Sequence, residues 1–313
     1  MYIKCSLYAI KSKSMLKEIL NIKNNKWLNK AYVQSQTSPF IDKKNKARLI
    51  ESPNSELKSI QKLIKNMLSR YQFPNYVFSG VKKKSYVDNA NEHKGKTYLY
   101  KVDISSFFPN TSRNKVYQFF KNELKTSSDV ANILTNFCTF DLSSIIQTNN
   151  EIASFLDSKK IIHLNHLSTG ACTSPVLSYL VNKQMFNELY ETCEQNNIKM
   201  TIYIDDISFS STNPLVKNLR SRIISIITKN GYNISVKKTK YYLPTDVKKV
   251  TGVIIKKDGS TDVPNKLRLK IKSKFENLKS DSDKKQLAGY IAAAKQIRKD
   301  IYPSISHSIK MKA

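Results

Sequence analysis

Apolar residues recur along this chain in two patterns, one typical of helices and one typical of strands. After a turn at 53–56, apolar positions recur every three or four residues over 57–68, which predicts a helix. The same spacing predicts helices over 114–124 and 219–227. It also predicts one long helix over 174–189, with a proline in its first turn.

Strand-like segments alternate in polarity or are rich in β-branched and aromatic residues. Residues 98–104 (YLYKVDI) fit this pattern, and so do 199–204 and 207–210 on either side of Asp205-Asp206. The last two segments predict a hairpin with two carboxylates at its tip. Further strands are predicted over 43–50, after a turn at 231–233, and as a pair over 249–255, whereas 145–164 fits neither pattern.

The two ends of the chain differ from this central part. Residues 1–40 predict an irregular or helical leader, with a helical pattern over 15–20. A boundary is predicted near residue 262, and behind it one face of a helix carries Leu267, Ile271, Phe275 and Leu278. Around that face lie more cations than solubility requires, namely Lys266, Arg268, Lys270, Lys272 and Lys274.

The charge balance indicates a polyanionic partner. The 313 residues include 53 lysines and arginines against 24 acids, a formal net charge of +29. Such a balance favours a nucleic-acid partner that is bound with salt-sensitive affinity. A membrane surface is the rival partner, but the lysines are spread along the chain and are not gathered in one amphipathic helix.

The composition also predicts a cytoplasmic location. The chain has no run of about 18 apolar residues, and lysines interrupt the N-terminus too often for a signal peptide. The cysteines form no CxxC pair, which predicts free thiols in a reducing compartment and no zinc site. They are Cys5, Cys138, Cys172 and Cys193.

Three aspartates at strand ends point to metal-dependent chemistry. An acidic pair such as Asp205-Asp206 is usually a solvated turn, but here β-branched and aromatic residues flank it, so a buried sheet supports the turn. Like charges there are costly unless a cation neutralises them. Asp103 ends another predicted strand. Carboxylates that converge in this way suit two Mg²⁺ ions and an in-line displacement at a phosphate.

Three segments resemble the motifs of reverse transcriptases. Residues 203–206 (YIDD) resemble their YxDD box, and 102–109 (VDISSFFP) resemble their first metal-binding motif. Between them, 169–175 (TGACTSP) is similar to their QGxPxSP motif. The order and spacing match, and the three motifs together are far more specific than any one of them.

Other segments narrow the resemblance to retron-type enzymes, over about residues 45–300. Residues 89–93 (NANEH) resemble the NAxxH box of that group, and 250–252 (VTG) resemble its VTG box. The segments that fit the fingers of the same family are 48–61 (RLIESPNSELKSIQ), 78–80 and 84–85.

The resemblance implies an α+β, right-hand polymerase fold, with fingers, a palm built on an antiparallel sheet, and a small helical thumb. It divides the chain into an N-terminal leader (1–40), fingers with part of the palm (41–98), palm with an interleaved fingers segment (99–262) and a basic helical thumb (263–313).

The resemblance also implies roles in the active site. Asp103 and Asp205 would hold two Mg²⁺ ions, supported by Asp206 and the Ile104 carbonyl. Phe108 would pack under the sugar of the incoming nucleotide and exclude a 2′-hydroxyl. Plain core packing is the alternative for this aromatic residue.

Four further residues would contact the nucleotide by the same resemblance. Arg48 would clamp the triphosphate, with a solvated charge as the alternative. Lys238 would lie near the leaving pyrophosphate, a choice that its lysine neighbours leave open. Gly170 and Ala171 would permit close approach of backbone to the incoming base or the template.

The chain departs from the family pattern at three motif positions. Thr169 replaces the usual Gln and is shorter, and Cys172 replaces the usual Pro. Ile204 replaces the Ala common in retron enzymes, and its bulk would tighten the side of the site that faces the primer strand. None of the three is an expected metal ligand.

RNA recognition is expected outside the active site. A lone His is usually a structural hydrogen-bonding residue, but by resemblance the 89–93 box would position structured RNA or the junction of fingers and palm. The basic thumb would choose the template. The residues expected to bind RNA are Asn89, His93, Val250, Thr251, Gly252, Lys266, Arg268, Lys270, Lys272 and Lys274.

The implied reaction is RNA-directed DNA synthesis from dNTPs. Its template would be a cognate structured noncoding RNA, its product a branched RNA–DNA hybrid (msDNA), and its partner a retron effector protein in antiphage defence. Three alternatives stay open. They are another bacterial reverse transcriptase (from an intron, a diversity-generating element or an abortive-infection system), a catalytically silent polymerase fold that holds RNA, and an RNA-directed RNA polymerase, for which Phe108 is the discriminator.

Overall fold

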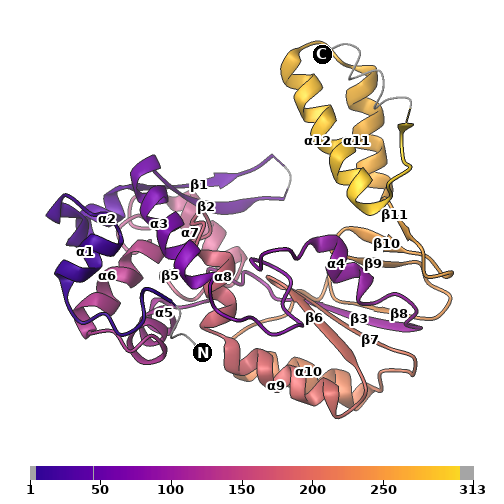
Figure 1. Ribbon diagram of the computed structural model, residues 1–313, viewed down its shortest axis with the longest axis horizontal. Coiled ribbons are helices and arrows are strands. Elements are labelled where there is room, and N and C mark those ends of the chain that lie inside the picture. The colour runs from indigo at the N-terminus through magenta and orange to yellow at the C-terminus, as the bar shows by residue number, and fades with distance from the viewer. Residues whose placement is uncertain (1–4, 45, 304–313) are drawn as a thin grey trace.

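Helices make up most of the N-terminal part of the structure, an antiparallel sheet its centre, and two helices the last described segment (Figure 1). The computed structural model describes residues 5–44 and 46–303. Its mixture of helices and antiparallel sheets confirms the predicted α+β class. Within those described ranges, no helix combines the length and the apolar character needed to cross a membrane.

The elements follow one another in mixed order along the chain. The helices are α1 (Lys13–Ile19), the 3₁₀ turn η1 (Asn25–Leu28), α2 (Lys30–Ser35), α3 (Ser55–Leu68), α4 (Tyr86–Asn91), α5 (Arg113–Gln118), the π-helical η2 (Phe119–Glu123), α6 (Ser128–Cys138), α7 (Asn150–Ser158), α8 (Ser174–Leu180), α9 (Lys183–Glu194), α10 (Lys217–Lys229), α11 (Asn265–Glu276) and α12 (Asp281–Ile297). The strands are β1 (Thr37–Asp42), β2 (Arg48–Pro53), β3 (Tyr98–Asp103), β4 (Thr139–Asp141), β5 (Asn165–Leu167), β6 (Lys199–Tyr203), β7 (Asp206–Ser211), β8 (Lys240–Tyr242), β9 (Lys248–Val250), β10 (Val253–Ile255) and β11 (Thr261–Asp262).

Four antiparallel strands, in the order β6–β7–β3–β8, form the central sheet and confirm the strand and the hairpin predicted over 98–104 and 199–210. Neighbouring side chains of a strand point to opposite faces. Val102 and Phe209 lie on the face that is buried in the main core with α9 and α10, which run along one side of the sheet (Figure 1). Asp103 points to the opposite, polar face.

The leader is part of the main hydrophobic core. Leu16 of α1, Trp27 of η1 and Val33 of α2 are buried in one cluster with Phe137 of α6. The prediction of an irregular or helical leader is confirmed, since most of its described residues lie in helices or turns. The packing continues past the end of the leader, because β1 begins at Thr37 and pairs with β2.

The long helix predicted over 174–189 is interrupted between α8 and α9. Asn182 lies at the interruption with a buried side chain. Its amide oxygen accepts a hydrogen bond from the Tyr232 hydroxyl at 2.9 Å, and its amide nitrogen donates to the Ser178 carbonyl at 2.9 Å. An asparagine side chain competes with the helix backbone for hydrogen bonds. The helix is therefore interrupted at Asn182, although the apolar spacing continues past it.

Two predicted strands are corrected by the structure. The chain after the 231–233 turn makes only a single bridge, between Ile234 and Ile104, and β8 begins later, at Lys240. The segment predicted as a strand over 43–50 becomes one only at Arg48, where β2 pairs with β1. Both errors arise because a basic segment with a few apolar residues has the same pattern in a loop as at the edge of a sheet.

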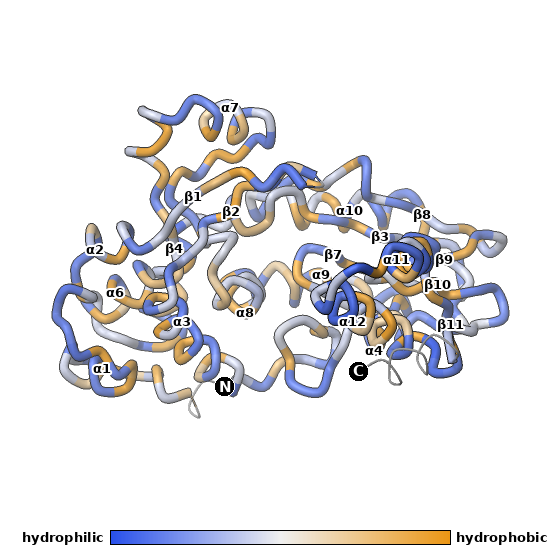
Figure 2. The backbone as a smooth tube through the Cα atoms, turned by 90° about the horizontal axis from the view of Figure 1, so that it is seen from above, coloured by the Kyte–Doolittle hydropathy of each residue, from blue (hydrophilic) through white to orange (hydrophobic). Residues whose placement is uncertain are grey.

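A second hydrophobic cluster joins the last two helices to the small sheet β11–β10–β9 and to α4 (Figures 1 and 2). Val250 and Val253 are buried in it with Ile271 of α11 and Leu287 of α12. The strand pair predicted over 249–255 is confirmed as β9 and β10. The helix predicted behind residue 262 is confirmed as α11, but it ends before Leu278, and Phe275 of its predicted apolar face is exposed.

Candidate active site

The three predicted carboxylates come together at one end of the central sheet. Asp103 is the last residue of β3 and lies directly opposite Asp206, the first residue of β7. Asp205 is in the turn just before β7, and its backbone carbonyl accepts a hydrogen bond from the N–H of Ile104 at 2.9 Å. The alternation of strand side chains therefore places Asp103 and Asp206 on the same polar face.

Ile204 and Asp205 form the two-residue turn between β6 and β7. Ile204 has a φ of +61°, a left-handed conformation that is unusual for a β-branched residue. Its N–H donates to the Ser79 hydroxyl at 3.1 Å. Such a strained conformation persists when tertiary contacts hold it, and here it fixes the direction of the acidic turn.

Two lysines neutralise the carboxylates of Asp103 and Asp206. The ammonium of Lys238 lies 2.7 Å from each carboxylate oxygen of Asp103, and that of Lys101 lies 3.0 Å from Asp206. Lys101 is not among the site residues predicted from the sequence. It could have been found from its place on β3, two residues before Asp103, because that spacing puts both side chains on one face.

The carboxylates repel one another in a poorly solvated place. Burial, and after it the Asp103 charge, raise the pKa of Asp205 to about 6. Burial also raises the pKa of Asp206, against the charge of Lys101, which lowers it. In this electrostatic setting, a bound cation would stabilise the ionised carboxylates and so lower the free energy of the folded protein.

A cavity of about 340 Å³ lies beside these carboxylates. The predicted site residues that line it are Arg48, Asp103, Ile104, Phe108, Asp205 and Lys238. Other residues that line it were not predicted from the sequence, among them Lys46, Phe155, Lys159 and Ile161. Thr169, which replaces the usual Gln of the motif, lines it as well. Phe155 belongs to α7 and Lys159 follows it, in the segment that fitted neither periodicity, so pattern alone could not reveal them.

Gly170 does not line this cavity, and the structure gives a different reason for a glycine there. A Cβ added to Gly170 would lie 1.9 Å from the backbone carbonyl oxygen of Glu51 on β2. The close approach that needs a glycine is therefore with the protein's own backbone. Ala171 is buried beside it. The predicted contact of these two residues with base or template stays a prediction.

The 89–93 and 250–252 segments meet each other. The amide of Asn89 donates to the Thr251 hydroxyl at 3.3 Å, and that hydroxyl donates to the Tyr86 carbonyl at 2.7 Å. The side chains of Asn89 and Val250 are buried, so any effect they have on RNA would pass through the segments they hold.

His93 is a buried connection between α4 and the polar face of the sheet. Its ring nitrogens are each 2.7 Å from a hydroxyl, one of Ser210 and one of Thr201. Burial, followed by the charges of nearby lysines, lowers the pKa of His93 to about 3. The imidazole is therefore neutral at physiological pH, which suits the structural reading of this residue.

The basic helix α11 combines paired cations with a lysine-lined cavity. Arg268 pairs with Asp262, and the Lys274 ammonium lies 2.9 Å from Asp283. Lys266 and Lys270 line a cavity of about 640 Å³ that also includes residues of α12. Their predicted RNA contact, with that of Lys272 and Gly252, stays a prediction.

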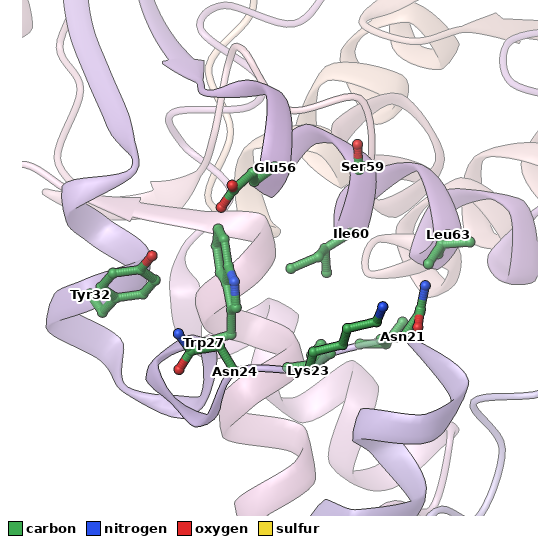
Figure 3. Close-up of a pocket in the computed structure, with 11 residues that line it drawn as sticks. Asn21, Lys23, Asn24, Trp27, Tyr32, Glu56, Ser59, Ile60 and Leu63 are labelled. Carbon is green, nitrogen blue, oxygen red and sulfur yellow. The ribbon is translucent and has the colours of Figure 1, made fainter.

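Another cavity, of about 560 Å³, lies between the leader and α3 (Figure 3). Trp27 and Tyr32 approach it from the leader, and Ile60 and Leu63 from α3. Its lining contains one acid, Glu56, and one lysine. Since it lacks a cluster of carboxylates, the cavity beside Asp103 is the candidate active site.

Comparison with known proteins shows which family this chain belongs to. Residues 41–271 match the family described as "Reverse transcriptase (RNA-dependent DNA polymerase)". The chain is 27% identical over 222 residues to the Retron Se72 reverse transcriptase of Salmonella heidelberg (strain 579083-10), covering 68% of this chain and 52% of that protein. It is 26% identical to the Retron Ec86 reverse transcriptase of Escherichia coli (67% and 59%) and 26% identical to the Retron Ec83 reverse transcriptase of Escherichia coli (80% and 78%).

The chain thus spans between half and three fifths of the length of the first two relatives. The family match, in contrast, includes Arg48, all three aspartates, and α11 as far as Ile271. Because it covers well over half of the 313 residues, this chain belongs to the reverse transcriptase family, and retron reverse transcriptases are among its relatives.

Proposed function

We propose that this protein is an RNA-directed DNA polymerase of the retron type, which copies a structured noncoding RNA into DNA and leaves a branched RNA–DNA hybrid (msDNA). One observation supports this most. Asp103 and Asp205 line a cavity together with Arg48, Phe108 and Lys238, so acid, cation and aromatic groups meet where a nucleoside triphosphate would need them.

The proposed architecture is that of a right hand. The β1–β2 hairpin and the helices around it would be the fingers (41–98), and the central sheet would be the palm (99–262), with α7 as an interleaved fingers segment. The α11–α12 pair would be the thumb (263–313), and the leader (1–40) would brace the fingers through the shared core.

The chemistry of these residues supports a divalent cation site. Hard carboxylate oxygens are the ligands that Mg²⁺ prefers, and the raised pKa of Asp205 marks a place where positive charge is needed. Asp103, Asp205 and the Ile104 carbonyl would hold two Mg²⁺ ions, supported by Asp206. When bound, the ions would activate the attacking 3′-hydroxyl and stabilise the leaving pyrophosphate.

One of the two lysines would then change its partner. Lys238 now neutralises Asp103, and its ammonium would be released toward the triphosphate when the site is loaded. Lys101 would keep Asp206 in place. Lys46, Arg48 and Lys159 line the same cavity and could together neutralise the phosphate chain.

Sugar selection is expected to depend on Phe108. A Phe108→Ala variant should incorporate rNTPs, relative to dNTPs, roughly tenfold more readily, because the side chain that would contact C2′ is gone. Steady-state primer extension with each nucleotide measures the ratio. Phe155→Ala, which removes another ring from the same cavity, is the matched control and should leave the ratio unchanged. Preference of the wild-type protein for rNTPs would instead favour an RNA polymerase.

The template and product can be identified directly. The net charge and the proposed thumb predict that a structured RNA copurifies with the protein. Sequencing of that nucleic acid should reveal DNA joined to a 2′-hydroxyl of the RNA that it copies. Random cellular RNA without attached DNA would contradict the retron assignment, and inactive protein with bound RNA would favour the silent RNA-binding fold. We further propose a retron effector as partner in antiphage defence, which coexpression and copurification would test.

A further inference from the structure

A fully buried acid–imidazole pair lies behind the nucleotide cavity. Glu51 is in the middle of β2 and His166 is in β5, and neither side chain is exposed to solvent. The His166 Nε2 atom lies 2.7 Å from Oε1 of Glu51, and Nδ1 lies 2.5 Å from the carbonyl of His163. A carbonyl only accepts, so Nδ1 donates its proton there, and Nε2 forms the second hydrogen bond of the ring with Oε1 of Glu51.

The other oxygen of the same carboxylate reaches the motif loop. Oε2 of Glu51 accepts a hydrogen bond from the backbone N–H of Thr169 at 2.7 Å. The Ser168 hydroxyl donates to the backbone carbonyl of Glu51 at 3.3 Å. Gly170 packs so closely on that carbonyl that no side chain fits between them. Three successive loop residues are thus held against one residue of β2.

Burying such a pair is costly unless its hydrogen bonds are satisfied, and here they are. Burial by itself would lower the pKa of His166, but the charge and hydrogen bond of Glu51, with the His163 carbonyl, raise it above its ordinary value. Removing one partner would leave the other buried and unpaired. The pair is therefore a firm connection between two segments that are far apart in sequence.

Both segments contribute to the nucleotide cavity. Arg48 lies three residues before Glu51 on β2 and lines the cavity. Thr169, whose N–H the Glu51 carboxylate holds, lines it as well. A shift of β2 relative to the loop would change the spacing between these two residues, on which the fit of a nucleotide depends.

We propose that Glu51 and His166 are positioning residues for the incoming nucleotide. They clamp β2 to the 168–170 loop, so that Arg48 and Thr169 keep a fixed spacing across the cavity. This inference rests on the proposed polymerase function and adds a determinant of nucleotide affinity to it. The pair touches neither the aspartates nor the thumb, so its effect is on binding of the nucleotide and not on the chemical step.

The test compares two substitutions of Glu51. Glu51→Leu removes both hydrogen bonds and should raise KM for dNTPs roughly tenfold, with kcat within about threefold of the wild type. Glu51→Gln can still accept from Thr169 and donate to a neutral His166, so KM should stay within about threefold. Gln61→Leu is the control, since Gln61 is a buried polar residue of α3 that donates to the Phe137 carbonyl at 2.9 Å. It should lower Tm without raising KM.

Several outcomes would overturn the inference. They are an unchanged KM in Glu51→Leu, a loss confined to kcat, or an equal rise in KM in Gln61→Leu. If the wild type extends no primer, the proposed function fails by itself. In that case, calorimetric titration of wild type and Glu51→Leu with dATP and Ca²⁺ tests the role of the Glu51–His166 pair. Equal affinities for dATP would contradict the clamp, and weaker binding by Glu51→Leu would support it.

Discussion

An Asp205→Asn variant is expected to lose primer extension by on the order of 10³-fold, because metal-assisted charge stabilisation contributes several kcal/mol to such a reaction. Asparagine keeps the shape of the side chain but offers a neutral oxygen in place of a carboxylate. The rate of dNTP incorporation on a primed RNA template measures the loss. Asp129→Asn, which removes an exposed carboxylate of α6 paired with Lys13 of α1, should retain activity.

The same variant should gain stability while it loses activity. The pKa of Asp205 is raised in the folded protein to about 6, so its protonated form is favoured there. The stability linked to that proton is fully present below the unfolded pKa of about 4 and is lost as pH rises through about 6. A neutral asparagine escapes this loss. Thermal melts without Mg²⁺ should therefore show a higher Tm for Asp205→Asn at pH 7.5, and no such difference at pH 4.

A lower Tm for Asp205→Asn at pH 7.5 would contradict this electrostatic account. Wild-type activity in the variant would contradict the proposed function itself. Activity and Tm together distinguish loss of a metal ligand from misfolding, because a misfolded variant would lose both activity and stability.

Gly170→Ala is expected to reduce primer extension by roughly 100-fold and to lower Tm. Its new Cβ would lie 1.9 Å from the Glu51 carbonyl oxygen, 2.6 Å from its carbon and 3.2 Å from the Ser52 Cα. All three are backbone atoms, so β2 itself must move, and overpacking of this kind costs about 1–3 kcal/mol. Since β2 carries Arg48, the displacement would reach the cavity.

The control for this prediction is another glycine with free space. Gly289 lies in α12, and a Cβ added there meets no atom within 4 Å. Gly289→Ala should preserve activity and raise stability by about 0.5–1 kcal/mol, since alanine is the better helix former. If Gly170→Ala were as active as Gly289→Ala, the close packing of the loop on β2 would not matter for catalysis.

The sequence was informative wherever chemistry and local periodicity coincide. Asp103 and Asp205 could be placed at strand ends because alternation marks β3, β6 and β7, and a hairpin fixes its own tip. The interruption at Asn182 could not be foreseen, since its cause is a hydrogen bond from Tyr232, which is distant in sequence.

The residues that line the cavity also show what local sequence patterns cannot predict. Lys159 follows α7, within the 145–164 segment that was left unassigned, and it reaches the site only through tertiary packing. The Glu51–His166 pair also joins two residues that look unremarkable in sequence. The meeting of Asn89 with Thr251 is another case, because two motifs chosen by resemblance turn out to contact each other. Long-range pairing of this kind has no local signature.

The strand order of the central sheet has a consequence for synthesis on the ribosome. β3 lies between β7 and β8, and the residue opposite Asp103 is Asp206, which is 103 residues later (206 − 103). At about 5–20 residues per second, β3 waits roughly 5–20 s for its first partner strand. Through that interval its backbone is an open edge that other nascent chains could join. Slow codons between the two strands would lengthen this exposure and lower the yield of folded protein.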